Sequence, residues 1–422
     1  MLPPGLPLPD WLRRLETLSP NEIDLGLERV AEVLGRMDIE PPARVILVGG
    51  TNGKGSSVEM LRALLTRDNV VGTYTSPHVV RYNERIAVNG LLATDQEIVA
   101  AFERVEAARG DVRLTYFEFG TLAALAVFEA ANVDTAVLEV GLGGRLDAVN
   151  VVNPDASLIT NVSLDHCEWL GDDVETIGYE KAGIMRAGKP VVFADPEMPA
   201  SVAAQADKLG ARLIHAGRDY SWTPDEDARW SWHGQGVELP GLAIPALRGP
   251  MQLQNAAGAL ALVEALGLTQ LLEPAHVNPA FSSLRLHGRM QVIEQEQRWL
   301  LDVAHNPAAA AALAASLRQY EARAAVAIAG ILDDKNVEGI VGPLAALVDN
   351  WIAVTADSPR AIDAAELARR IANETGKACL IAETTDMAVE RARVMAGNGG
   401  RVLVTGSFYT VGPFLERLSA RD

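Results

Sequence analysis

Short apolar runs alternate with segments of helical periodicity along most of the chain. In the first part, strands are predicted at residues 44–50, 70–76, 134–141, 155–162 and 189–194. Between the first two of these, Val58, Leu61 and Leu65 recur with the spacing of one helix face. Because strands and helices alternate, the sequence predicts an α/β fold with a largely parallel, doubly wound sheet.

A second series of strands follows a segment of different character. Residues 219–247 contain Trp222, Trp230 and Trp232 among glycines and prolines without a helical period, which predicts a small antiparallel β element appended to the sheet. Later strands are predicted at 298–303, 324–331, 350–355, 377–382 and 401–405. We therefore expect two domains, a P-loop domain at residues 1–287 and a smaller Rossmann-like domain at 288–422.

Composition narrows the class of protein. Hydrophobic residues make up 49% and charged residues 22% of the 422 positions, as in ordinary globular domains. No apolar run reaches the roughly 18 residues that span a membrane, and the N-terminal segment does not resemble a secretory signal. The two cysteines, Cys167 and Cys379, form no disulfide framework, so a cytoplasmic location is expected. A net charge of −18 argues against nucleic-acid binding.

The strongest local signal follows the first predicted strand. The run Gly50-Thr51-Asn52-Gly53-Lys54-Gly55-Ser56 forms a glycine-rich turn ahead of a helix. Such a turn directs backbone N–H groups at an anion, and the helix dipole adds to the attraction. The strict G-x-x-x-x-G-K-[ST] pattern is not met, because residue 48 is Val and Gly55 follows Lys54. An ordinary βα turn is the alternative, but the placement of Lys54 favours a phosphate-binding loop.

Polar residues also stand where other predicted strands end, at the edge that binds ligands in open α/β sheets. Glu139 and Ser76 are candidate Mg²⁺ ligands there, and His166 is a third. A salt-bridged glutamate, a plain surface loop and a hydrogen-bonded core histidine are the respective alternatives. Arg81 follows Ser76 closely and suits an anionic substrate.

Three further positions have the right chemistry in less specific surroundings. Lys181 stands beside Glu180 at a helix–turn junction, a context that by itself is typical of a solvated cation. In the second domain, Asp302 suits a ribose or adenine contact at a strand end, and His305 lies near enough in sequence to face a phosphate.

Nine motifs occur in a fixed order along the chain: GTNGKGS, TSPHVVRYNERI, LTYFEFGTLAAL, LEVGLGGRLDAVN, SLDH, EKAGI, HGR, LDVAHNP and GSFYTVG. Together they resemble the bacterial dihydrofolate synthase/folylpolyglutamate synthases, which are relatives of the Mur ligases, over nearly the whole chain. The resemblance implies an ATP-dependent ligase that adds L-glutamate to dihydropteroate and to reduced folates through an acyl phosphate. It also implies a monomer without nucleic-acid or membrane partners.

The resemblance assigns roles to particular positions. For ATP it implies Gly50, Thr51, Asn52, Gly53, Lys54, Gly55, Ser56, Asn255, Arg289 and Asp302. For two Mg²⁺ ions it implies Ser76, Glu139, His166 and Lys181, the last carrying a carbamate derived from CO₂. For the acceptor it implies Asp24, Leu25, Gly26, Thr115, Tyr116, Phe117, Glu118, Leu146, Asp147 and Ala148. Lys54, Lys181 and His305 are the candidate catalytic residues, although the sequence does not decide which group deprotonates the amine.

Two other functions are disfavoured by the sequence. A cell-wall Mur ligase would carry a UDP-sugar-binding domain ahead of the phosphate loop, and the 48 residues before Gly49 are too few for one. A signalling nucleotide switch would leave the second α/β domain without a role, and the Asn-Lys-x-Asp guanine-reading motif is absent from the sequence.

Overall fold

The computed structural model describes residues 5–19, 23–321 and 323–420. The chain forms two compact units. The first contains Met1–His78, Tyr82–Ala246 and Leu253–Leu284, and the second contains Val79–Arg81, Leu247–Gln252 and Arg285–Asp422. In the described ranges, no helix is long and apolar enough to cross a membrane.

The main sheet of the first unit has eight strands in the order β4-β3-β2-β5-β1-β6-β7-β8. Their bounds are β1 Arg44–Gly49, β2 Val71–Tyr74, β3 Ile86–Val88, β4 Leu91–Leu92, β5 Thr135–Glu139, β6 Ala156–Ile159, β7 Pro190–Phe193 and β8 Arg212–His215. The short β3 and β4, which the sequence analysis missed, pair in antiparallel fashion at one edge. The predicted, largely parallel sheet is confirmed.

The register of this sheet sets the position of the site. β1 lies between β5 and β6, and Val48 pairs with both Glu139 and Leu158. The carboxyl ends of these three strands therefore meet at one edge of the sheet. In a doubly wound sheet, this edge is where a ligand crevice forms.

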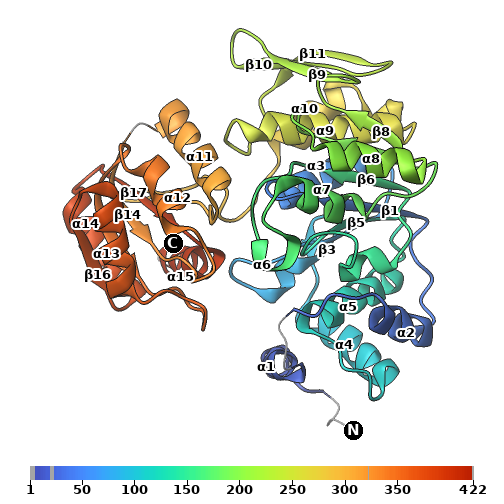
Figure 1. The fold of residues 1–422 in the computed structure, drawn as a ribbon, viewed down its shortest axis with the longest axis horizontal. Helices are drawn as coiled ribbons and strands as arrows, with labels where there is room; N and C mark the ends of the chain where they lie inside the picture. Colours follow the sequence, from blue (N-terminus) through green and yellow to red (C-terminus); the bar gives the residue numbers. More distant parts are fainter. Residues whose placement is uncertain (1–4, 20–22, 322, 421–422) are drawn as a thin grey trace. The chain divides into compact units, whose positions relative to one another are not determined.

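Helices cover both faces of the sheet (Figure 1). They are α1 Leu8–Leu18, α2 Glu28–Met37, α3 Lys54–Leu65, α4 Asp95–Arg109, α5 Tyr116–Ala130, α6 Cys167–Leu170, α7 Val174–Ala182, α8 Ala200–Leu209, α9 Met251–Ala265 and α10 Pro274–Ser282. α1, α4 and α5 pack around a buried aromatic cluster, in which the Phe102 ring centroid lies 5.7 Å from Trp11 and 5.4 Å from Phe119. This cluster fixes α5, the helix that carries several predicted acceptor residues.

The predicted antiparallel β element is a separate three-stranded sheet, ordered β11-β10-β9. Its strands are β9 Ser221–Pro224, β10 Arg229–His233 and β11 Glu238–Ala243. Trp230 and Trp232 lie two residues apart on β10 and are both fully buried, because alternate residues of a strand share one face.

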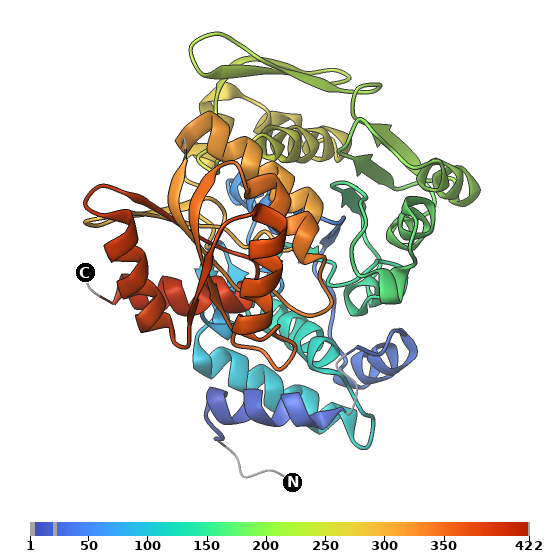
Figure 2. The same ribbon diagram turned by 60° about the vertical axis from the view of Figure 1, so that its left-hand side comes forward.

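The second unit has its own sheet, ordered β12-β13-β17-β14-β15-β16 and parallel except for β12. The strands are β12 Gln291–Glu294, β13 Arg298–Leu301, β14 Ala324–Ala329, β15 Val348–Val354, β16 Cys379–Ala382 and β17 Arg401–Thr405. The helices are α11 Pro307–Ser316, α12 Val337–Val341, α13 Ala364–Thr375, α14 Thr385–Ala396 and α15 Phe408–Ser419, and Figure 2 shows them on both sides of the sheet. The predicted Rossmann-like α/β fold is confirmed, whereas the sequence analysis missed β12.

Candidate active site

The glycine-rich loop connects β1 to α3, and the helix begins at Lys54. Gly50 and Gly53 have φ values of 135° and 87°, in the region that favours glycine. A Cβ atom on Gly50 would lie 1.9 Å from Oγ1 of Thr160, and one on Gly53 would lie 2.6 Å from Oδ1 of Asn255. Both glycines are therefore required by close approach as well as by conformation, and Asn255 of α9 lies directly against the loop.

Two residues after β6 hold this loop in place. The Asn161 carbonyl oxygen accepts a hydrogen bond from Thr51 N at 3.0 Å, and its side-chain Oδ1 accepts one from Asn52 N at 3.1 Å. The Thr160 hydroxyl donates to the Asn52 carbonyl oxygen at 2.6 Å. The sequence analysis missed both residues, although a polar Thr-Asn pair ending an apolar strand was a usable signal.

Lys54 and Ser56 provide the polar atoms of the first helical turn. The Lys54 ammonium donates to the carbonyl oxygens of Gly50 and Thr51 at 3.2 and 3.1 Å, so it lies over its own loop. The Ser56 hydroxyl is buried and has no hydrogen-bond partner among the described residues. A buried hydroxyl without a partner is costly, so Ser56 is well suited to bind a phosphate oxygen or a hard cation.

Of the predicted metal ligands, Glu139 lies beside this loop and Ser76 lies beside Glu139. Glu139 ends β5, is buried, and accepts a hydrogen bond from Ser76 N at 3.1 Å. A Cβ atom on Gly55 would lie 3.5 Å from its Oε2, so the carboxylate borders the phosphate loop. His166 is half-buried with a left-handed backbone (φ 52°). The described ranges contain no group of three or more His, Cys, Asp or Glu residues that could hold a metal.

Lys181 lies in the last turn of α7 with only 4% of its surface exposed. It is therefore not the solvated cation that its sequence context suggests. Burial and, to a lesser extent, the nearby Lys54 charge lower the pKa of Lys181 to about 7, with Asp165 and Asp147 opposing the shift. A substantial fraction of this amine is consequently neutral near physiological pH.

Three predicted acceptor segments lie together, because α2, α5 and the short 3-10 helix η2 (Ala148–Val151) pack against one another. Thr115 caps α5, and its backbone N–H donates to Glu118 at 2.7 Å. Arg29, which the sequence analysis missed, binds Glu118 at 2.9 Å and Asp24 at 3.1 Å. The segment Asp24-Leu25-Gly26 is thereby tied to the start of α5.

Two aromatic side chains begin α5. Phe117 is half-buried, and its ring is so close to Gly141 that a Cβ atom there would lie 2.7 Å from Cζ. The Tyr116 ring is 5.4 Å from the guanidinium carbon of Arg85, a cation–π contact. Phe117 is thus not a fully buried core residue, and it lies beside the loop that follows Glu139.

Asp147 closes that loop. Its Oδ2 accepts from Leu142 N at 2.7 Å and its Oδ1 from Val149 N at 3.1 Å, so both oxygens already hold backbone groups. Burial raises the pKa of Asp147 to about 7. Its neighbours in the predicted segment differ, since Leu146 is half-buried and Ala148 is buried.

In the second unit, the predicted residues form a cluster around Phe408. The Arg289 guanidinium carbon lies 5.3 Å from the Phe408 ring centroid, and the His305 ring lies 5.7 Å from it. Asp302 is half-buried and accepts from Met290 N and Ala304 N, both at 2.9 Å. Burial raises the pKa of Asp302, and Arg289 opposes the rise. Arg81 belongs to this second compact unit and is exposed.

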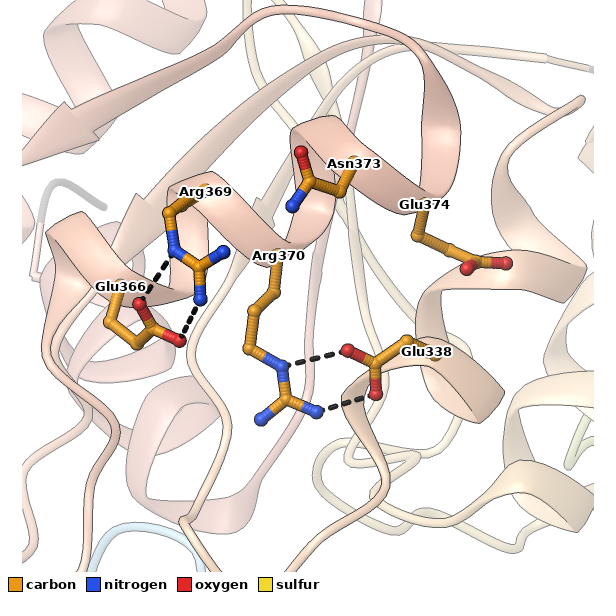
Figure 3. A pocket seen from close by; sticks show the side chains of 6 residues that line it. All are labelled: Glu338, Glu366, Arg369, Arg370, Asn373 and Glu374. Atoms are coloured by element: carbon orange, nitrogen blue, oxygen red, sulfur yellow. Dashed lines mark hydrogen bonds and ion pairs between the residues drawn. The ribbon is translucent and has the colours of Figure 1, made fainter.

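A polar pocket of the second unit is formed by residues of α12 and α13 (Figure 3). It is lined by Glu338, Glu366, Arg369, Arg370, Asn373 and Glu374. Arg369 binds Glu366 through two hydrogen bonds of 2.9 and 2.7 Å, and Arg370 forks onto Glu338. None of the residues predicted from sequence lines this pocket.

Known proteins are similar to this chain in sequence and in the order of their domains. The Mur ligase middle domain matches residues 48–263, and the Mur ligase glutamate ligase domain matches residues 288–408. The dihydrofolate synthase/folylpolyglutamate synthase of Escherichia coli (strain K12) is 41% identical over 98% of this chain and 96% of its own length.

Solved structures agree in fold. E. coli FolC in complex with DHPP and ADP superposes with a TM-score of 0.92 at 38% identity, covering 100% of both chains. The bifunctional folylpolyglutamate synthase/dihydrofolate synthase from Yersinia pestis, complexed with AMPPNP and Mn ion, gives 0.90 at 38% identity, covering 99% of this chain and 100% of that one. This chain therefore belongs to the Mur ligase family and, within it, to the dihydrofolate synthase/folylpolyglutamate synthases.

Proposed function

We propose that this protein is an ATP-dependent ligase that adds L-glutamate to dihydropteroate, giving dihydrofolate, and to folyl-glutamates. The observation that carries the proposal is the glycine-rich loop, in which Gly55, between Lys54 and the buried Ser56, lies against the carboxylate of Glu139. The family supports the same reaction, since its relatives bear both activities in their names and its second domain is a glutamate ligase domain.

The nucleotide would bind first to the phosphate loop. The N–H groups of the first helical turn have no partners within the helix and point toward an anion at its N-terminus. Lys54 would release its two loop carbonyls and neutralise the terminal phosphate. Asn255 lies against the same loop, which supports its predicted role in ATP binding. For Arg289 and Asp302, nucleotide binding remains a prediction.

The residues near this loop fit a divalent cation. Glu139 and Ser76 offer side-chain oxygens and are neighbours, since the Ser76 backbone N–H donates to Glu139, and Ser56 has a buried hydroxyl without a partner among the described residues. Mg²⁺ prefers such hard oxygen ligands. His166 and Lys181 complete the proposed set. When bound, the ion supplies Lewis-acid stabilisation of charge on the phosphate oxygens.

We propose that Lys181 carries a carbamate. The neutral amine adds to CO₂, forming an N–C bond and releasing one proton, and the product is an anion with two oxygen donors. Burial favours this step because the lowered pKa leaves a reactive amine. The neighbouring Glu180 does not neutralise Lys181, since it pairs with Arg145 at 2.9 Å.

The reaction then proceeds in two displacements. An oxygen of the acceptor carboxylate attacks the γ-phosphorus of ATP, and the bond between this phosphorus and the β,γ-bridging oxygen breaks. ADP departs, and the acceptor becomes an acyl phosphate. The amine of glutamate attacks the acyl carbon, loses a proton, and expels inorganic phosphate. That His305 is the base that accepts this proton remains a prediction. Water must be excluded, because an acyl phosphate hydrolyses readily.

The acceptor would lie against α2, α5 and η2. Phe117 offers a half-exposed aromatic face beside Gly141, which suits stacking on an aromatic ring. Asp147 has lone pairs left after its two backbone contacts, so it can also accept from a pterin N–H. Asp24, Leu25, Gly26 and Arg81 remain predicted contacts of the acceptor.

The test is release of phosphate from ATP and Mg²⁺ by the purified protein, with acceptors offered one at a time. We expect release only when a folate-type acid and L-glutamate are both present, with the ligated product identified by mass spectrometry. Release that is independent of the acceptor, or that requires a different amino acid, would contradict the proposal.

A further inference from the structure

The loop between β5 and η2 rests directly on the last turn of α7. A Cβ atom on Gly144 would lie 2.9 Å from the carbonyl oxygens of both Glu180 and Lys181. The Arg145 N–H donates to the Glu180 carbonyl oxygen at 2.9 Å. A Cβ atom on Gly183 would lie 2.3 Å from that of Arg145. Loop and helix end are therefore in backbone contact, with no room for a side chain between them.

The side chains of Arg145 and Asn150 add hydrogen bonds to this backbone contact. Arg145 forks onto the Glu180 carboxylate, with Nη2 at 2.9 Å from Oε1 and Nε at 3.2 Å from both oxygens. The buried Asn150 amide donates to the carbonyl oxygens of Arg145 at 3.0 Å and Gly183 at 3.1 Å. None of these side chains has a role in the reaction as described above.

This contact between the loop and the end of α7 joins two parts of the candidate site. The loop starts immediately after Glu139, a proposed metal ligand, and ends at Asp147, a proposed acceptor contact. The helix turn beneath it carries Lys181. A shift of the loop along α7 would change the distance between the acceptor contacts and Lys181.

We propose that Arg145 and Glu180 are positioning residues that fix the 141–147 loop against Lys181. The pair keeps the acceptor contacts and the metal-side helix at one spacing. This inference rests on the proposed function and deepens it, because it identifies the link between the acceptor and metal parts of the same site.

The expected sizes of the effects on stability and on turnover distinguish a positioning role from a purely structural one. The Arg145 side chain is 43% exposed, and an ion pair of such exposure contributes little to the stability of the fold. A displacement of about 1 Å in a reacting group costs on the order of 100-fold in rate. Loss of the pair should therefore reduce turnover far more than it reduces stability.

The experiment compares Arg145→Met and Glu180→Gln with a matched ion-pair variant of the same unit, Lys189→Met. Lys189 pairs with Asp155 at 2.9 Å, and its side chain is 48% exposed. Three quantities are measured: turnover with dihydropteroate, Mn²⁺ affinity in the presence of AMPPNP by electron paramagnetic resonance, and the melting temperature.

We expect both site variants to lose about 10- to 100-fold in kcat and in Mn²⁺ affinity, while their melting temperatures match that of Lys189→Met. The double variant should lose no more than either single variant, because the two residues act as one pair. Arg145→Lys, which keeps the charge but not the fork, should recover part of the loss.

The proposal is overturned if Arg145→Met and Lys189→Met agree in kcat and Mn²⁺ affinity, or if Arg145→Met changes only the melting temperature. Failure of the proposed function is a different result, because the wild-type protein would then show no glutamate-dependent turnover. In that case, the Mn²⁺ measurement still decides whether the pair positions the metal side of the site.

Discussion

A Cβ atom on Gly53 would lie 2.6 Å from Oδ1 of Asn255, although the two positions are 202 apart in sequence number. Gly53 is the N-cap residue of α3 with φ 87°, and Asn255 is on α9. The phosphate loop is therefore shaped both by its own glycines and by a helix contributed from much later in the chain.

The first prediction follows from this contact. Gly53→Ala should weaken ATP binding by at least about tenfold, because it adds a collision with Asn255 to about 1–2 kcal/mol of left-handed strain. Gly210→Ala is the matched control, since Gly210 has φ 67° and an added Cβ atom would meet no other atom within 4 Å. Calorimetric titration with AMPPNP measures the affinity. Equal affinities of the two variants would show that the collision does not matter.

The second prediction concerns Lys54. Lys54→Ala should reduce kcat by about 10²–10³-fold, because one charge that stabilises the transferring phosphoryl group is removed. Its melting temperature should stay near the wild-type value, since the ammonium bonds to carbonyls of its own loop. Steady-state kinetics and thermal melting test both parts, with Lys189→Ala as the control. Near-native turnover of Lys54→Ala would remove the phosphate-loop assignment.

The third prediction concerns the carbamate on Lys181. Protein incubated with ¹³C-labelled bicarbonate and Mg²⁺ should show a carbamate carbon signal by NMR, and Lys181→Ala should lose both the signal and the activity. Short-chain carboxylates should restore part of the activity by replacing the missing oxygen donors. A high-resolution map of the Mg²⁺-bound protein with a bare Lys181 ammonium would contradict the prediction.

Sequence patterns predicted the sheet and the strand ends well, because both depend on neighbouring residues. Glu139 and the loop at Gly50–Lys54 were found from an apolar strand followed by polar or glycine positions. Arg29 and the Thr160–Asn161 pair were missed, because their partners lie far away in sequence. Only the folded chain shows that Arg29 joins Asp24 to Glu118.

Some sequence-based interpretations changed in the fold. Lys181 is buried rather than solvated, because α7 turns it toward the interior of the unit. Asp147 is engaged by two backbone N–H groups, a role that composition and spacing do not reveal. β3, β4 and β12 were missed, and for β3 and β4 the reason is that strands of three and two residues carry little periodic signal.

The fourth prediction is a pH dependence of stability. Burial and, to a lesser extent, the Arg85 charge lower the pKa of His78 to about 4, with Glu84 opposing the shift. In the unfolded chain its pKa is about 6.5, so between pH 6.5 and 4 the unfolded state binds a proton that the folded state does not. The stabilisation is fully present above pH 6.5 and is lost as the pH falls toward 4, by up to about 1.4 kcal/mol per unit.

His78→Asn tests this dependence. The asparagine Oδ1 can replace Nδ1 as the acceptor of the 2.9 Å hydrogen bond from Arg85 Nε, but it does not titrate. Urea unfolding at pH 7.5 and 5.5 should show a smaller loss of unfolding free energy in the variant, by about 1 kcal/mol. The same loss in both proteins would show that His78 is not responsible.

The last prediction is that one site performs both ligations and that Phe117 distinguishes them. In dihydropteroate the reacting carboxylate is close to the pterin, whereas in a folyl-glutamate it is one residue farther away. A ring stacked on Phe117 should therefore matter most for dihydropteroate. Phe117→Leu should raise KM for dihydropteroate by about tenfold, the equivalent of about 1.4 kcal/mol of lost stacking, with a smaller change for a reduced folyl-monoglutamate and none for ATP.

Phe128→Leu is the matched control, because Phe128 is on the same helix but fully buried against Gly72. It should lower the melting temperature without altering the preference between acceptors, since it removes packing remote from the start of α5. The assay offers each acceptor separately with ATP and glutamate. Turnover of the folyl-monoglutamate alone would reduce the activity to polyglutamylation, and equal KM changes for both acceptors would place Phe117 outside the region that reads the pterin.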